Sequence, residues 1–144
     1  MRTSIIAFAI SAVSLFIAAS SVNAQTTNAN VITLSTKEFC EKVYDINAES
    51  LKYKGDKPAI VDFYADWCGP CRAIAPTLQT LAAAYGDKIV IYKVNIDNSP
   101  ELAQAFGIQS IPAVMYIPLK GEPVMTSGSR DRGKFEKEIA AYLL

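Results

Sequence analysis

Two cysteines, Cys68 and Cys71, are separated by two residues in the stretch WCGPC at residues 67–71. An apolar run at residues 59–65 precedes them and predicts a buried strand, and apolar residues at helical spacing follow them. A cysteine pair at a strand-to-helix junction is typical of thiol–disulfide redox chemistry. The unpaired N–H groups and the dipole at the helix start would favour the thiolate of Cys68. Pro70 suits this first turn, because its ring fixes a helical φ and it has no N–H to leave unpaired.

Two other roles for the cysteine pair are a metal site and a purely structural disulfide. A zinc site needs two further ligands, but Cys40 is the only other cysteine and the sequence contains no histidine. A structural disulfide that closes so short a loop would add little stability. We therefore favour a redox pair and expect no bound metal.

Asp62 interrupts the apolar run before the cysteines. An unpaired carboxylate is costly to bury, so it tends to stay protonated or to find a partner. The alternative is that Asp62 lies at an edge of the sheet or faces solvent. Cys40, the third cysteine, falls on the apolar face of a helix that Ser35 and Glu38 would begin as a capping box. We expect Cys40 to be a small buried apolar residue, and the alternative is a reactive thiol.

The elements that position these residues alternate between strand and helix and end with a hairpin and a helix. This order predicts an α/β fold in which a mixed sheet carries helices on both faces. Residues 45–57 predict a surface connection with at most one helical turn. The helix after Cys71 is expected to continue through Pro76, which should kink it. Strands are predicted at residues 31–34, 59–65, 89–96, 113–117 and 123–126. Three helices are predicted to begin at Ser35, at the cysteine pair and after an N-cap at Ser99, and the last two should end at Tyr85 and at Phe106. A fourth helix is predicted at the C-terminal end, where Phe135, Ile139, Tyr142 and Leu143 are spaced as on a helix.

The N-terminus has the three-part layout of a secretory signal peptide. One basic residue, Arg2, precedes an apolar stretch at residues 5–19, and small residues follow at Val22 and Ala24. The apolar stretch is shorter than the roughly 20 residues that span a membrane, which argues against the alternative of an uncleaved anchor. We predict a cleavable signal peptide at residues 1–24, a flexible segment at residues 25–30 and a single domain at residues 31–144. The cysteines would then work where disulfides persist.

The composition excludes several classes of function. The 144-residue chain has 14 basic and 14 acidic side chains, so it lacks the basic excess of a nucleic-acid-binding protein. Without histidine, it has no imidazole base. Three cysteines are too few for a disulfide-rich scaffold.

The chain resembles a thioredoxin. The resemblance spans roughly residues 31–144, and the WCGPC stretch is highly specific. The departures are the export signal, the longer segment before Ala59, Arg72 where lysine is usual, and the loop at residues 117–119. The matching residues are Val61 to Arg72, Ala75 and Pro76, Lys93 to Asp97, Gly107 to Pro112, and Gly128.

The resemblance implies roles for the residues around the cysteines. Cys68 resembles the exposed attacking cysteine and Cys71 the inner resolving one, and the two form a disulfide when oxidised. Asp62 corresponds to the residue that takes the proton from Cys71. Lys93 corresponds to a lysine near that carboxylate, although it could be an ordinary surface lysine with a packed stem.

The resemblance also implies a docking surface for substrates. Ile111 and Pro112 resemble a cis-proline element that faces the cysteines and exposes the backbone of Ile111 to an extended substrate. We favour a surface position for Trp67 over a core position, because it lies just past a strand end. The remaining residues of this surface are Gly69, Pro70 and Gly128.

These expectations describe an exported thioredoxin that reduces disulfides in client proteins without a cofactor. It would act as a monomer in the bacterial periplasm, without stable insertion in the membrane, and would receive electrons from a membrane thiol carrier. One alternative is a disulfide oxidant or isomerase, although Gly69 and Pro70 resemble reducing members and the absence of histidine removes a feature of oxidising ones. Another is a binding module with an idle redox pair.

Overall fold

A computed structural model describes residues 30–144 of the chain. The predicted signal peptide and all but the last residue of the predicted flexible segment lie outside these residues. Within them, a five-stranded mixed sheet has the strand order β1-β3-β2-β4-β5. The elements are β1 (Ile32–Thr33), α1 (Thr36–Lys42), β2 (Ala59–Tyr64), α2 (Gly69–Tyr85), β3 (Val90–Asn95), α3 (Pro100–Ala105), β4 (Ala113–Ile117), β5 (Val124–Ser127) and α4 (Arg132–Tyr142).

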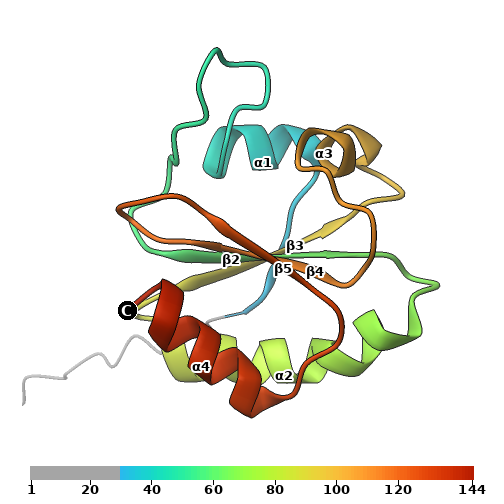
Figure 1. Cartoon of the computed structure of the whole chain (residues 1–144), viewed down its shortest axis with the longest axis vertical. Coiled ribbons are helices and arrows are strands. Elements are labelled where there is room, and N and C mark those ends of the chain that lie inside the picture. The colour runs from blue at the N-terminus through green and yellow to red at the C-terminus, as the bar shows by residue number, and fades with distance from the viewer. Residues whose placement is uncertain (1–29) are drawn as a thin grey trace, which may run out of the picture.

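The sheet forms the middle layer of three. Figure 1 shows α1 and α3 on one face and α2 and α4 on the other. The predicted element order and the prediction of helices on both faces are therefore confirmed. No helix at residues 30–144 is long and apolar enough to cross a membrane.

The strand that leads to the cysteines is the central one. β2 pairs in parallel with β3 and antiparallel with β4. Its side chains alternate between the two faces. Val61 and Phe63 join the apolar cluster that contains Phe39 of α1 and Leu102 of α3, whereas Ile60 joins the cluster that contains residues of α2 and α4. Asp62 therefore points to the α2 and α4 face.

The helix starts agree with the two predicted N-caps, although only one of the two side chains makes a capping hydrogen bond. Ser35 and Glu38 form the predicted capping box at α1. Ser99 is the N-cap of α3 and Pro100 its first residue, as predicted, but Ser99 is buried and its hydroxyl makes no capping hydrogen bond. Its backbone has φ −139° and ψ 55° rather than the extended conformation that aims a cap hydroxyl at the first turn. α2 continues through Pro76, as predicted.

Two further sequence predictions concern the segment after α1 and Cys40. The segment at residues 45–57 is a surface connection, as predicted, and it contains no helical turn. The Asp45 carboxylate accepts the Asn47 N–H at 3.0 Å and closes a local turn instead. Cys40 is only partly buried and forms no disulfide, so the prediction of a fully buried residue is wrong. Its neighbours explain this, because Phe39 of α1 and the C-cap residue Val43 take the positions that face the core.

Candidate functional site

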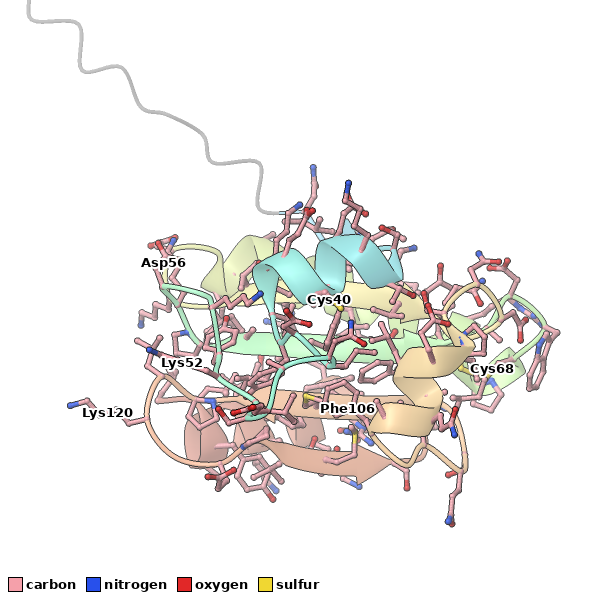
Figure 2. The ribbon with its side chains drawn as sticks, turned by 90° about the horizontal axis from the view of Figure 1, so that it is seen from above. Cys40, Lys52, Asp56, Cys68, Phe106 and Lys120 are labelled. Atoms are coloured by element: carbon pink, nitrogen blue, oxygen red, sulfur yellow. A yellow bond between two sulfur atoms is a disulfide. The ribbon has the colours of Figure 1, made fainter. Side chains whose placement is uncertain are left out.

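The cysteine pair lies where β2 passes into α2. Figure 2 shows Cys68 at the opposite end of the sheet from Asp56 and Lys120. Cys68 is the N-cap of α2, and its sulfur accepts the backbone N–H of Cys71 at 3.2 Å. The two cysteines form a disulfide, with their Cα atoms 5.3 Å apart. This geometry places the Cys68 sulfur at the positive end of the helix, where a thiolate is stabilised.

Both cysteines are buried in the disulfide form. Cys68 is 4% exposed and Cys71 is 3% exposed, so the expected contrast between an exposed and an inner cysteine is absent. The reason is their shared environment. Both sulfurs belong to one small apolar cluster with Ala65, against which Ile96 and Ile111 pack.

The loop before β4 and the loop after β5 meet beside this cluster. The Ile111–Pro112 peptide bond is cis. The N–H of Gly128 donates to the carbonyl oxygen of Pro112 at 2.9 Å. Gly128 has a φ of +93°, which residues with a Cβ rarely adopt. The structure therefore brings Gly128 to Pro112 from a distant part of the chain, and Ile111 links both to the cysteines.

Trp67 lies at the surface beside the cysteines. Its side chain is 68% exposed, and its indole N–H donates to Asp97 at 2.9 Å. Asp97 is one of the residues that carry the family resemblance, but the sequence predicts no role for it. No local pattern relates it to Trp67, which lies 30 positions away. A cleft of about 250 Å³ adjoins the indole and is lined by Trp67, Ile96, Ile108, Gln109, Ser110 and Ile111.

Asp62 is buried, at 3% exposed, in the central strand that leads to the cysteines. Burial raises its pKa from 3.8 to about 7, although the positive charges of Arg130 and Lys93 act in the opposite direction. Among the residues that the structure describes, none donates a hydrogen bond to its Oδ1 atom. The alternative of a solvent-facing carboxylate is therefore wrong. Asp62 also lines a cleft of about 370 Å³ together with Arg72 and Lys93.

Lys93 stands opposite Asp62 in the pairing of β2 with β3. Its ammonium lies 5.1 Å from the centroid of the Tyr64 ring, a cation–π contact. No ion pair within 4.0 Å joins Lys93 to Asp62 among the described side chains. Lys93 therefore acts on Asp62 through the field of its charge rather than through a direct contact.

Arg130 is a part of this region that the sequence analysis does not identify. It is 5% exposed, it contributes to the electrostatics of Asp62 and it donates to the carbonyl oxygen of Gly128. No sequence signal marks it, because an arginine in the polar stretch before the last helix resembles an ordinary surface residue. No group of three or more potential metal ligands occurs at residues 30–144.

Comparisons with known proteins agree with this architecture. The model of the family described as "Thioredoxin" matches residues 30–141. A thioredoxin of Borreliella burgdorferi is 38% identical over 112 residues, which cover 77% of this chain and 96% of that protein. A thioredoxin of Alicyclobacillus acidocaldarius is 43% identical over 91 residues, which cover 62% of this chain and 86% of that protein. The M-type chloroplast thioredoxin of Pisum sativum is 35% identical over 117 residues, covering 79% of this chain and 68% of that protein.

The fold, the redox-active cysteine pair at the start of α2 and these similarities lead to one conclusion. The chain belongs to the thioredoxin family and is a protein-disulfide oxidoreductase.

Proposed function

We propose that this protein is an exported thioredoxin that reduces disulfides in client proteins, with Cys68 as the nucleophile and Cys71 as the resolving cysteine. The observation that carries the assignment of roles is the position of Cys68 as the N-cap of α2, with the Cys71 N–H directed at its sulfur. The helix start can stabilise a thiolate on Cys68 both when it attacks and when it leaves.

The proposed reaction has two steps of thiol–disulfide exchange. The Cys68 thiolate attacks one sulfur of the client disulfide, forms a mixed disulfide and releases the other client sulfur as a thiolate. The Cys71 thiolate then attacks the Cys68 sulfur, breaks the mixed disulfide and releases the second client sulfur. The client gains two electrons, and the Cys68–Cys71 disulfide forms. No cofactor takes part in either step.

Asp62 is the proposed acceptor of the Cys71 proton. A carboxyl group whose pKa is about 7 can both take up and release a proton near neutral pH. The cleft that Asp62 lines would give water a route to this otherwise buried carboxyl group. Lys93 would tune the reaction, since its charge keeps the Asp62 pKa from rising further.

The proposed client-docking surface surrounds the cysteines. An extended client segment would pair with the backbone of Ile111, in the manner of an added strand. One client side chain would enter the cleft between Trp67 and Ile111, where the lining is largely apolar. The remaining docking residues would be Gly69, Pro70, Pro112 and Gly128.

We further propose that the protein is exported to the bacterial periplasm after cleavage behind Ala24, and acts there as a monomer. A membrane thiol carrier would supply its electrons. Mass spectrometry of the exported protein should give Gln25 as the first residue. A mature protein that retains Met1 would contradict the proposed cleavage.

The direction of the reaction is tested by the reduction potential of the Cys68–Cys71 pair. Equilibration with glutathione should give a value near −270 mV, which is typical of thioredoxins, whereas about −120 mV is typical of a strong oxidant. The second value would refute the proposed reductase and favour the oxidant. A turnover assay tests the alternative of a binding module, because an idle pair would reduce protein disulfides no faster than free dithiol.

A further inference from the structure

Arg130, in the loop between β5 and α4, is buried in an unusual way for an arginine. Its side chain is fully inaccessible to solvent. Nη1 donates to Glu138 at 3.2 Å and to Thr126 at 2.5 Å. Nε and Nη2 both donate to the carbonyl oxygen of Gly128, at 3.3 and 2.9 Å. The guanidinium therefore joins α4, β5 and the loop that carries Gly128.

The charge of Arg130 is balanced inside the protein. The Glu138 carboxylate is only 12% exposed and also accepts the hydroxyl of Tyr116. The Phe135 ring lies under the guanidinium, 5.4 Å from its central carbon. A well-packed apolar pair is often as stable as a buried ion pair, so stability alone gives little reason for a charged pair here.

The contacts of Arg130 lead directly to the proposed docking surface. Its fork holds the carbonyl oxygen of Gly128, and the N–H of the same residue donates to Pro112 at 2.9 Å. Gly128 has no side chain to fix its position, and a glycine has many conformations available besides the φ of +93° that it adopts here. The Arg130 guanidinium therefore holds the peptide unit that follows Gly128, and the Pro112 carbonyl oxygen holds the peptide unit that precedes it.

We propose that Arg130 is a positioning residue that holds the Gly128 and Pro112 backbone in the conformation that binds client proteins. This inference rests on the proposed function of that surface. A preorganised surface binds more tightly, because the backbone does not have to be ordered when the client arrives. Arginine suits the task better than lysine, because its planar fork directs two donors at one oxygen while a third nitrogen binds elsewhere.

Three variants test the proposal. Arg130→Lys keeps the charge and removes the fork. Arg130→Met combined with Glu138→Leu replaces the whole ion pair with apolar side chains, which protects the fold from an unpaired buried charge. Arg132→Met is the matched control, because it removes a nearby arginine whose ion pair with Glu136 is partly exposed.

Two substrates separate docking from chemistry. Insulin presents a protein disulfide that must dock, whereas the small aromatic disulfide of Ellman's reagent needs little of the docking surface. Both Arg130 variants should raise the KM for insulin about fivefold, roughly the effect of ordering one or two residues upon binding. In Arg130→Lys, which keeps the positive charge near Asp62, the kcat for insulin and the rate with Ellman's reagent should stay within twofold of the wild type. Arg132→Met should change neither.

Amide hydrogen exchange gives a second readout that does not depend on activity. The Gly128 N–H should exchange at least several-fold faster in both Arg130 variants and at the wild-type rate in Arg132→Met. A wild-type KM for insulin in both folded Arg130 variants would overturn the proposal, as would an equal loss of activity with both substrates in Arg130→Lys. A wild-type protein that reduces neither substrate refutes the proposed function instead, and Gly128 exchange then still decides whether Arg130 fixes this backbone.

Discussion

Asp62→Asn should stabilise the folded protein and slow its catalysis. Asp62 is 3% exposed, and burial raises its pKa from 3.8 to about 7. One pKa unit corresponds to about 1.4 kcal/mol, so ionising Asp62 costs about 4 kcal/mol more in the folded protein than in the unfolded chain. The asparagine side chain has nearly the same shape and cannot ionise. Its buried amide offsets part of the gain, so we expect about 2–4 kcal/mol of added stability at pH 8.

The stability that Asp62→Asn adds must increase as the pH rises. Between about pH 4 and pH 7 the folded protein keeps the Asp62 proton while the unfolded chain has lost it, so the unfolding free energy of the wild type falls as the pH rises through this window. Above about pH 7 both states are ionised and the difference is constant. Below about pH 4 both are protonated, and the contribution from ionisation disappears.

Urea unfolding of both oxidised proteins from pH 4 to pH 8 measures this difference. Asp87→Asn, at an exposed carboxylate after α2, is the control and should change stability little at any pH. Turnover with insulin at pH 7 should fall by about 10- to 100-fold in Asp62→Asn, because the proton acceptor is lost. A stability difference that stays the same from pH 4 to pH 8 would refute the assignment of a destabilising buried carboxylate.

Three further substitutions test other parts of the account. Ser35→Ala should lower the unfolding free energy by about 1 kcal/mol in urea titrations, because it removes the capping box of α1; an unchanged midpoint would contradict this. Cys40→Ala should keep insulin reduction within about twofold, since Cys40 lies outside the cysteine cluster; loss of most activity would place it in the mechanism. Trp67→Ala should raise the KM for insulin about tenfold, because an exposed tryptophan supplies much of a docking surface, and a wild-type KM would remove Trp67 from that surface.

Much of the fold follows from local patterns in the sequence. The apolar run around Val61 predicts a central strand, because a strand that is covered on both faces has apolar side chains on both of them. The spacing of Ile74, Leu78 and Leu81 predicts α2, and all three are buried in it. The N-cap position of Ser99 is also predicted, whereas the missing hydrogen bond of its side chain depends on a backbone conformation that residue type alone does not determine.

The site is predictable only in part. The cysteine spacing and the carboxylate in an apolar strand are visible in the sequence, so residue types and spacing are enough to select Cys68, Cys71 and Asp62. They are not enough to reveal the burial of Arg130, because it depends on Glu138 and Tyr116, which come from α4 and β4. The similar exposure of the two cysteines also depends on packing between segments far apart in the sequence, through Ile96 and Ile111.

The proposed roles of the two cysteines are tested most directly by trapping mixed disulfides. Cys71→Ser leaves the first attack intact and removes the resolving thiol, so this variant should accumulate client adducts on Cys68 that dithiothreitol releases. Cys68→Ser should give almost none, because the thiolate at the helix start is lost. Non-reducing gels followed by mass spectrometry measure both. Abundant adducts from Cys68→Ser and few from Cys71→Ser would contradict the account and reverse the two roles.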